Sequence, residues 1–210
     1  MAKIPRVRIE KFLKRHATKE RILDVGGGSG PYKKYFPNRV GFDVEPGPGV
    51  EYVGDAHKLS LFKDGEFSHV LSTEVLEHLQ DPQLAINEMH RVLKDGGKLI
   101  LTTRFVFPIH NAPGDYFRFT KYGLEHLLRN FRHVEIKEEI GTVGTLAVIF
   151  ERLSFQADTM FVKTLGVSWL LLSKITLLFQ WILTRQYSDV TRKSEIGNIM
   201  TSGYYVVAIK

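Results

Sequence analysis

The chain has 210 residues, of which 43% are hydrophobic and 25% charged, with a formal net charge of +6 and no cysteine. This length is typical of one domain with a substantial buried core. The lack of cysteine excludes disulfides, thiolate metal sites and cysteine nucleophiles. We therefore expect a single cytoplasmic domain over residues 1–210 that holds no metal.

The positive charge is concentrated at the N-terminus. Residues 1–21 contain eight Lys or Arg and two Glu, which together equal the whole net charge. Apolar residues spaced among these charges predict an amphipathic helix over 7–16, within a basic N-terminal segment 1–20. The segment lacks the apolar core of a signal peptide. It can face nucleic acid, an anionic membrane or an acidic substrate, or it is a solvated helix.

A glycine-rich turn follows the first predicted strand. Residues 22–30 read Ile-Leu-Asp-Val-Gly-Gly-Gly-Ser-Gly, an apolar run that enters a tight turn. Gly26, Gly28 and Gly30 allow positive φ and leave room for a ligand. A dinucleotide fingerprint requires a glycine where this chain has Pro31, which disfavours a nicotinamide oxidoreductase. A turn without a ligand is the other alternative.

Strands and helices alternate along the rest of the chain. Apolar runs predict strands at 21–25, 39–43, 52–53, 67–72, 99–102, 134–140 and 204–209. Cap and stop signals predict helices at 32–36, from Asp81-Pro82 to Gly96-Gly97, and from Thr120 to Leu128. This alternation predicts an α/β sandwich around a mostly parallel sheet.

Polar residues stand at several of the predicted strand ends. Asp24, Asp43, Asp55 and the run Ser72-Thr73-Glu74 all occupy such positions. Ligands of parallel sheets bind at the carboxyl ends of the strands. The sequence therefore predicts a single ligand site at this edge of the sheet.

Residues 22–103 resemble the type 11 group (ubiquinone/menaquinone-methyltransferase-like) of class I S-adenosylmethionine (SAM) methyltransferases. The matching motifs are residues 22–30, Gly-Phe-Asp-Val (41–44), Gly-Asp-Ala (54–56), Glu-Val-Leu-Glu-His-Leu (74–79) and residues 88–99. The resemblance implies a Rossmann-like fold with a seven-stranded sheet whose last strand is antiparallel. It also implies SAM as the cofactor and methyl transfer as the activity.

The same resemblance implies roles for individual residues. The three glycines of the turn would pass close to the ribose and the amino-acid tail of SAM, and Asp24 would lie near the ammonium group of that tail. Asp43 would accept from both ribose hydroxyls. Asp55 and the backbone of Ala56 would contact the adenine, and Thr73 would lie at the sulfonium. For each acid the alternative is a helix cap or a solvated loop.

The segment 104–120 directly follows the strand at 99–102, so we expect it to lie over the same sheet edge. Its Pro-x-His and Asp-Tyr-x-Arg-Phe-Thr text is similar to loops of type 11 relatives linked to cell-surface glycan or lipid-linked saccharide metabolism. Asp115, Tyr116 and Arg118 are the candidate acceptor-binding residues. His110 is the candidate general base, since imidazole titrates near neutrality. The alternative is a rigid lid in which Arg118 pairs with Asp115.

An apolar insertion occupies residues 142–201, where the family pattern has a tight hairpin. Its stretch 165–183 is long enough to span a bilayer, but Lys174 and a polar stripe at Ser173, Thr176, Gln180 and Thr184 disfavour this. We expect a helix that lies on the membrane or packs as a cover, paired with 145–158. Contact through 161–186 would be aided by Lys163, Arg185, Arg192 and Lys193. The alternative is a buried hairpin or a dimer face.

These observations predict a SAM-dependent methyltransferase that modifies a small-molecule or lipid-linked acceptor, for example a saccharide. Its predicted location is the cytoplasm, at or near the inner face of the membrane. Two alternatives are a non-catalytic SAM-binding scaffold and an RNA methyltransferase. The sequence contains no recognisable RNA-binding module, which disfavours nucleic acid as a partner. An oligomer is compatible with the sequence.

Overall fold

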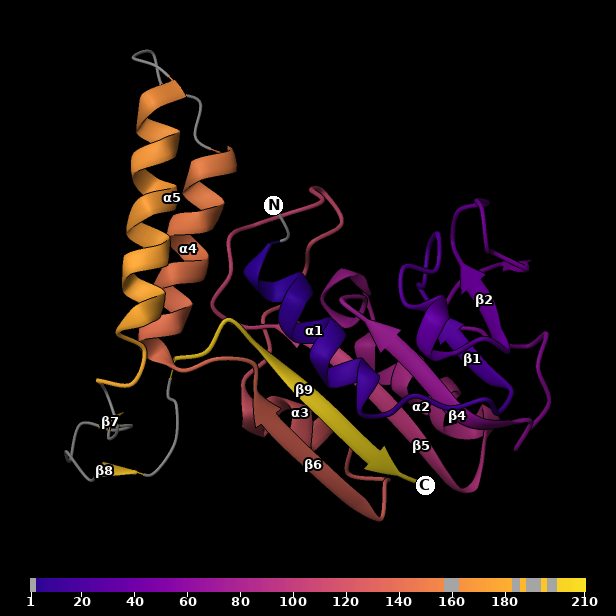
Figure 1. Cartoon of the computed structure of the whole chain (residues 1–210). Coiled ribbons are helices and arrows are strands. Elements are labelled where there is room, and N and C mark those ends of the chain that lie inside the picture. Colours follow the sequence, from indigo (N-terminus) through magenta and orange to yellow (C-terminus); the bar gives the residue numbers. More distant parts are fainter. Residues whose placement is uncertain (1–2, 157–162, 183–185, 188–193, 196–199) are drawn as a thin grey trace. The chain divides into compact units, whose positions relative to one another are not determined.

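The computed structural model describes residues 3–156, 163–182, 186–187, 194–195 and 200–210 (Figure 1). The chain divides into two compact units. The sheet unit comprises residues 9–104, 109–137 and 204–210, and the hairpin unit comprises residues 1–8, 105–108 and 138–203.

A seven-stranded sheet of order β3-β2-β1-β4-β5-β9-β6 forms the sheet unit. The strands are β1 (Ile22–Val25), β2 (Arg39–Asp43), β3 (Tyr52–Val53), β4 (Phe67–Thr73), β5 (Leu93–Arg104), β6 (His133–Glu138) and β9 (Gly203–Ile209). Strands β1 to β5 pair in parallel. Strand β9 is antiparallel to both β5 and β6. Near its C-terminal end it is bonded from Gly96 N to Lys210 O and from Arg132 N to Ile209 O, and near its start from Phe105 N to Ser202 O and from Glu139 N to Gly203 O. This confirms the predicted mostly parallel sheet with an antiparallel last strand.

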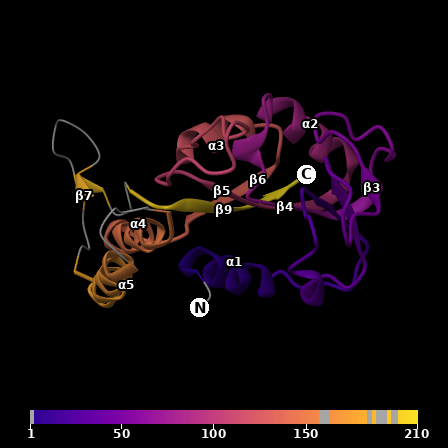
Figure 2. The ribbon, with the colours of Figure 1, turned by 90° about the horizontal axis from the view of Figure 1, so that it is seen from above.

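Helices cover both faces of this sheet. Figure 2 shows α1 (Ile4–Lys14) on one face and α2 (Pro82–Val92) and α3 (Lys121–Leu127) on the other. The side chain of Asp81 accepts from Leu84 N at 3.0 Å, and that of Thr120 accepts from Gly123 N at 3.1 Å. Both predicted N-caps are therefore confirmed. Single 3₁₀ turns lie at Lys33–Tyr35 and Leu76–His78, and the first replaces the helix predicted at 32–36.

The predicted end of α2 is wrong. The helix ends at Val92 rather than at Gly96-Gly97, and β5 begins at the next residue. Leu93 pairs with Phe67, and the register then shifts before the pairing resumes. A Cβ on Gly97 would lie 3.0 Å from Ser68 O and 2.8 Å from Lys94 O. Gly96 and Gly97 therefore belong to an irregular part of β5 and do not end a helix.

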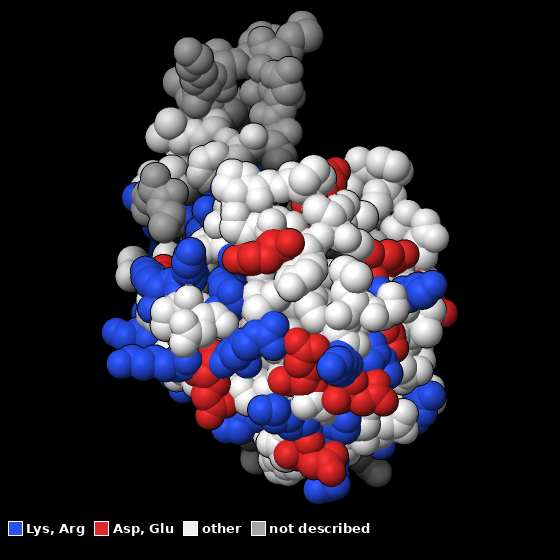
Figure 3. All heavy atoms as spheres, turned by 90° about the vertical axis from the view of Figure 1, so that its right-hand side faces the viewer, with Lys and Arg blue, Asp and Glu red and all other residues white. Residues whose placement is uncertain are grey.

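The core of the sheet unit forms where α1 packs on the sheet. Ile9, Phe12 and Leu13 are buried, and they pack with Ile22, Phe36, Leu71 and Ile100. Phe12 also stacks on Tyr205 with ring centroids 4.6 Å apart. These contacts confirm the predicted amphipathic helix. The lower half of the face drawn in Figure 3 carries Lys and Arg intermixed with Asp and Glu, whereas its upper half is mostly uncharged.

A buried ion pair joins β1 to β2. Arg39 Nε lies 2.7 Å from Asp24 Oδ2, and both side chains are less than 5% exposed. Arg39 Nη1 also donates to Gly49 O at 2.9 Å. Gly30 has a φ of +66°, and a Cβ there would lie 2.5 Å from Arg39 Nη1. The arginine thus holds two strands, the loop after β2 and the glycine turn together.

We expect Arg39→Met to lower the free energy of unfolding by about 3–5 kcal/mol, because it leaves a carboxylate buried without its partner. The measurement is urea denaturation followed by circular dichroism. Arg21→Met is the matched control, since Arg21 is half exposed in its pair with Glu66. Exposed pairs are worth about 0–1 kcal/mol. Equal losses in the two variants would contradict a structural role for the buried pair.

The hairpin unit contains two helices side by side, α4 (Thr142–Gln156) and α5 (Lys163–Leu178). Ser173 Oγ donates to Ala147 O at 2.7 Å, and the Phe150 and Trp169 rings stack at 5.7 Å. The predicted pairing of the apolar helix with 145–158 is confirmed. Two short strands, β7 (Gln186–Tyr187) and β8 (Ser194–Glu195), form a separate ladder. Arg185, Arg192 and Lys193 lie outside the described residues.

None of the helices in the described part of the chain combines the length and the apolar character that crossing a bilayer requires. Two residues of the predicted polar stripe, Ser173 and Gln180, contact neighbours within the unit, and Thr184 lies outside the described residues. Ser173 is 1% exposed, and Gln180 Oε1, just after the helix, accepts from Arg8 Nη2 at 3.2 Å. Several apolar side chains of α5 are exposed, among them Val167, Leu171 and Leu178.

Candidate active site

A cavity of about 520 Å³ opens in the sheet unit at the carboxyl ends of β1, β2 and β4. Residues from the glycine turn, from the ends of these strands and from the loop after β5 line it. They are Val25, Gly26, Phe42, Asp43, Val44, Gly54, Asp55, Ala56, His57, Glu74, Val75, His78, Leu79, Gln80, Asn111, Gly114 and Tyr116. The cavity thus lies at the predicted sheet edge, and its volume is typical of ligand pockets.

Four residues predicted to bind the cofactor line this cavity: Gly26, Asp43, Asp55 and Ala56. Gly26 and Gly28 have φ values of +70° and +47°, and a Cβ on Gly26 would lie 2.4 Å from a methyl group of Val75. The turn therefore requires glycine at these positions.

Asp43 ties the glycine turn to the end of β2. Its Oδ2 accepts from Gly28 N at 2.9 Å, and its Oδ1 accepts a longer bond of 3.3 Å from Glu45 N. A carboxylate oxygen can accept more than one hydrogen bond. Asp43 can therefore hold the turn and still accept from the hydroxyl groups of a ligand.

Asp55 is held by His57, which the sequence analysis did not identify. Asp55 Oδ1 accepts from His57 N at 2.9 Å and lies 2.5 Å from His57 Nδ1. His57 Nε2 accepts from Asp81 N at 3.1 Å, so the ring proton lies on Nδ1 and points to Asp55. The backbone bond from His57, followed by its ring, lowers the pKa of Asp55. The cavity wall therefore carries a carboxylate that is ionised at neutral pH.

Asp24 lies beneath the glycine turn and does not line the cavity. A Cβ on Gly27 would be 2.2 Å from Asp24 Oδ2, so the carboxylate directly underlies the backbone of the turn. Its partner is Arg39, and burial raises its pKa to about 6 in spite of that partner. Gly28, Gly30 and Thr73 are also absent from the cavity lining. Their roles toward the cofactor remain predictions.

The raised pKa of Asp24 makes stability depend on pH. The folded protein retains the Asp24 proton up to about pH 6, whereas a carboxyl of ordinary pKa 3.8 loses it earlier. The contribution of this group to the free energy of unfolding is therefore largest below pH 4 and is lost as the pH rises through 6. We expect the stability of wild type, measured relative to Asp24→Asn by urea denaturation, to fall as the pH rises from 4 to 7, because the variant has no carboxyl to ionise at this position. A constant difference would contradict the shifted pKa.

The loop after β5 is held by its own hydrogen bonds. Asp115 accepts from both terminal nitrogens of Arg118 at 2.6 Å and from His110 N at 2.8 Å, and its side chain is 1% exposed. The Arg118 guanidinium keeps the pKa of Asp115 well below its ordinary value. Arg118 thus pairs with Asp115, as the alternative of a rigid lid predicted. Neither lines the cavity, and their binding of an acceptor remains a prediction.

Tyr116 is the predicted acceptor residue that does line the cavity, and its hydroxyl accepts from Gln80 Nε2 at 3.0 Å. His110, the predicted base, lies next to the cavity rather than in its lining, beside the lining residue Asn111. Its ring packs edge-on against His78 with centroids 4.7 Å apart. His78 lines the cavity, and its Nδ1 lies 2.6 Å from Gly114 O.

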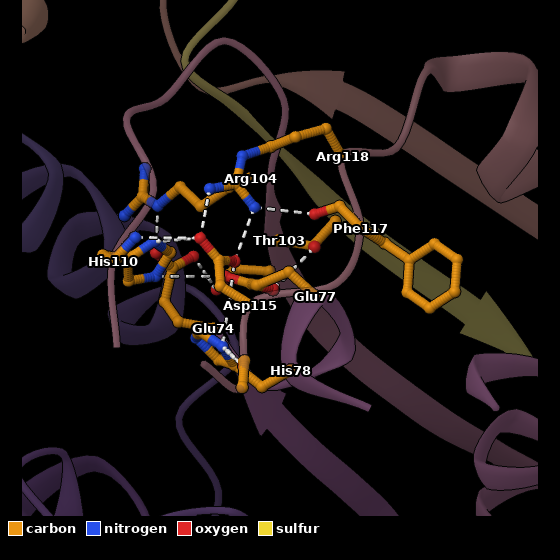
Figure 4. A network of polar contacts seen from close by, with 11 residues as sticks. Glu74, Glu77, His78, Thr103, Arg104, His110, Asp115, Phe117 and Arg118 are labelled. Carbon is orange, nitrogen blue, oxygen red and sulfur yellow. Dashed lines mark hydrogen bonds and ion pairs between the residues drawn. The ribbon is translucent and has the colours of Figure 1, made fainter. Parts of the chain in front are cut away.

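Two glutamates of the motif 74–79 stand beside these histidines (Figure 4). Glu74 has a φ of +58°, accepts from Thr102 Oγ1 at 3.0 Å and forms an ion pair with Arg104. Glu77 is fully buried, and its Oε2 accepts from Thr103 Oγ1 at 2.8 Å. Burial raises the pKa of Glu77. The left-handed backbone at Glu74 is the kind of strain found at functional sites.

Comparison with known proteins identifies this arrangement. A family model described as a methyltransferase domain matches residues 2–156. An uncharacterized protein of Methanocaldococcus jannaschii is 36% identical over 96 residues, which cover 42% of this chain and 47% of that protein. The ubiquinone biosynthesis O-methyltransferase of Pseudomonas aeruginosa is 29% identical over 128 residues, which cover 52% of this chain and 53% of that enzyme. The chain thus spans about half the length of these relatives.

Solved structures show the same fold. A phosphoethanolamine N-methyltransferase of Haemonchus contortus, in complex with S-adenosylhomocysteine (SAH) and phosphomonomethylethanolamine, has a TM-score of 0.58 and 18% identity. The match covers 98% of this chain and 53% of that enzyme. The family model spans most of this chain, and the sheet order is that of the methyltransferase fold. The chain therefore belongs to the class I SAM-dependent methyltransferase domain family, as the sequence motifs predicted.

Proposed function

We propose that this chain binds SAM in the cavity of the sheet unit and transfers its methyl group to a small-molecule acceptor. The observation that carries the proposal is the cavity itself, bordered by Gly26, Asp43, Asp55 and Ala56 at the strand ends. Two of the similar proteins, an O-methyltransferase of ubiquinone biosynthesis and a phosphoethanolamine N-methyltransferase, support a small acceptor.

The residues of the cavity fit the chemical groups of SAM. Asp43 offers carboxylate oxygens to the ribose hydroxyls, and its bond from Gly28 N keeps the turn in place. Asp55, ionised and fixed by His57, offers an acceptor to the adenine amine. Two carboxylates on one wall also favour a ligand that carries positive charge.

SAM supplies a methyl group on a sulfonium, which is already a good leaving group. The protein therefore contributes mainly by holding both reactants in line and by excluding water. Tyr116 and His78 line the side of the cavity that the loop after β5 borders. We assign this side to the acceptor, with Asp115 and Arg118 fixing the loop that carries Tyr116.

We expect Asp43→Asn to weaken SAH binding by about tenfold or more, roughly 1.4 kcal/mol, because one acceptor oxygen and the charge are lost. The remaining amide oxygen can still accept from Gly28 N, so the turn is retained. The measurement is calorimetric titration of SAH. Glu45→Gln, an exposed neighbour, is the control and should bind as wild type does. Equal affinities in all three proteins would contradict the ribose assignment.

We expect His110→Ala to lower turnover by about a hundredfold with little change in SAH affinity, because its side chain lies beside the acceptor side of the cavity. Turnover is measured as SAH formation with acceptors found by screening hydroxyl and amine compounds. His126→Ala, on the outer face of α3, is the control. An unchanged rate in His110→Ala would remove this residue from the reaction. SAH binding without turnover on any acceptor would favour the scaffold alternative.

We further propose that the acceptor is lipid-linked and that α5 contacts a membrane surface. The exposed apolar residues of this segment follow one helical stripe, with Val167 66%, Leu171 57% and Leu178 73% exposed. Trp181 and Ile182 extend it at 71% and 56%. Such a stripe, with Lys174 beside it and a chain of net charge +6, suits the interface of an anionic bilayer.

We expect Leu171→Glu with Leu178→Glu to reduce binding to phosphatidylglycerol vesicles by about tenfold or more, since each exposed leucine contributes apolar area to the contact. Co-sedimentation measures the bound fraction, with phosphatidylcholine vesicles as the uncharged comparison. Leu61→Glu is the matched control, because Leu61 is 60% exposed in the sheet unit. Absence of vesicle binding by wild type would contradict the proposal.

A nucleic-acid acceptor has less support. Proteins that bind RNA or DNA neutralise phosphates with clustered Lys and Arg. On the lower half of the face in Figure 3 the basic side chains are intermixed with acidic ones. We therefore do not extend the proposal to RNA.

A further inference from the structure

We propose that a second cavity in the sheet unit binds a phosphate group. The cavity has a volume of about 280 Å³, and most of the residues that line it carry positive charge or can acquire it. The lining residues are Arg15, His16, Ala17, Thr18, His69 and Lys98. Volumes of roughly 300–1,000 Å³ are typical of pockets for drug-sized ligands, so this cavity suits a smaller molecule. The proposal depends neither on SAM binding nor on methyl transfer by the chain.

The second cavity is separate from the candidate active site. His69 stands near the start of β4, whereas the active-site cavity lies beyond the end of this strand at Thr73. Arg15 and His16 directly follow the last residue of α1, which covers one face of the sheet (Figure 2). The C-terminal end of α1 and the amino-terminal part of β4 therefore meet at the second cavity, at the opposite edge of the sheet.

The sheet places His69 and Lys98 side by side. The two residues are register partners in the parallel pair of β4 and β5. Residues two apart in a strand share a face of the sheet, so His69 shares a face with Leu71, and Lys98 shares it with Ile100. Leu71 and Ile100 belong to the core beneath α1. The two basic side chains therefore stand where this apolar floor ends, below the end of the helix.

The cationic side chains of the cavity have one acidic partner. Nδ1 of His69 lies 3.4 Å from Glu20 Oε2, and the Glu20 side chain is 60% exposed. Among the residues that the structure describes, no carboxylate forms an ion pair with Arg15, His16 or Lys98. Positive charge therefore exceeds negative charge at this cavity, and an anion would balance it.

The surroundings of His16 show the same excess of positive charge. Burial lowers the pKa of its ring, and the charge of Lys98 lowers it further, against a smaller opposite effect of Glu135. Glu135 itself forms an ion pair with Lys137. Phe12 holds the His16 ring edge-on, with centroids 4.9 Å apart. A bound anion would offset the repulsion between His16 and Lys98.

A phosphate group matches this set of donors better than a carboxylate does. Arginine binds phosphate through two parallel N–H groups, and lysine adds a compact positive charge. Thr18 Oγ1 accepts from Glu20 N at 3.1 Å, so its own proton remains for donation to a ligand. A phosphate monoester carries about 1.5 to 2 negative charges at pH 7 and three acceptor oxygens, whereas a carboxylate carries one charge and two oxygens. The site also gives a role to part of the basic N-terminal segment, which contains Arg15 and His16.

The test is calorimetric titration of inorganic phosphate into the full chain at constant ionic strength. We expect saturable binding of one phosphate per chain, weakened at least tenfold when Arg15→Gln is combined with Lys98→Gln. Both side chains are exposed, so these changes should leave the fold intact, which thermal unfolding checks. Lys121→Gln combined with Arg132→Gln is the matched control. It removes the same charge from exposed positions elsewhere in the sheet unit and should bind as wild type does.

Nuclear magnetic resonance of the histidine rings locates the bound ion. We expect the signals of His16 and His69 to shift during the titration, while that of His126 on α3 stays in place. The variants His16→Gln and His69→Gln assign these signals.

Competition experiments distinguish the two sources of a phosphate group. Displacement of inorganic phosphate by glycerol 3-phosphate supports the site and assigns it to a free compound. Displacement only by vesicles that contain phosphatidic acid supports the site and assigns it to a lipid headgroup. The proposal is overturned if wild type does not bind phosphate saturably, or if the rings of His16 and His69 do not respond. Equal losses of affinity in the two double variants would also overturn it, because they would indicate attraction to net charge alone.

Discussion

The buried ion pair between Asp24 and Arg39 is the interaction on which the cavity depends. It fixes the end of β1 against the start of β2, and its arginine also holds the backbone at Gly49. The carboxylate lies under the glycine turn, so the turn can present Gly28 N to Asp43 on the side of the cavity. A polar contact outside the cavity thus determines the shape of its floor. Charged pairs as buried as this one are costly to desolvate, which makes them suitable for fixing geometry rather than for adding stability.

The sequence was a good guide to the elements that local signals determine. β2 and β3 have the predicted bounds, and the caps at Asp81 and Thr120 are as predicted, because alternating apolar runs and short-range hydrogen bonds define them. The end of α2 was mispredicted because Gly96-Gly97 is an ordinary helix stop in isolation. The helix end is instead determined by the pairing of β5, in which Gly97 closely approaches Ser68 on the neighbouring strand, and no local sequence pattern reveals this approach.

In the site, too, the sequence predicted the features that the topology sets and missed those that depend on contacts between elements. Asp43, Asp55 and Ala56 line the cavity at the predicted sheet edge, because strand ends in a parallel sheet converge, which is a property of the topology. The pairing of Asp24 with Arg39 and the support of Asp55 by His57 depend on side-chain contacts between elements, so the sequence left them undetermined. Glu77 and His78 belong to the motif 74–79. Their place beside His110 depends on how the loop after β5 folds back over this motif, which the sequence does not show.

The loop after β5 is held in place by its own hydrogen bonds and by bonds to Glu77. This bears on the rigidity of the cavity side that we assign to the acceptor. Asp115 receives both arms of Arg118 and the backbone of His110, and the carbonyl of Glu77 accepts from Tyr116 N at 2.9 Å and from Phe117 N at 3.1 Å. These hydrogen bonds must all break before the segment can open, which raises the free energy of opening. The side of the cavity that we assign to the acceptor is therefore better described as a preorganised wall than as a lid that closes on its ligand. Such rigidity suits methyl transfer, in which alignment of the two reactants supplies most of the rate.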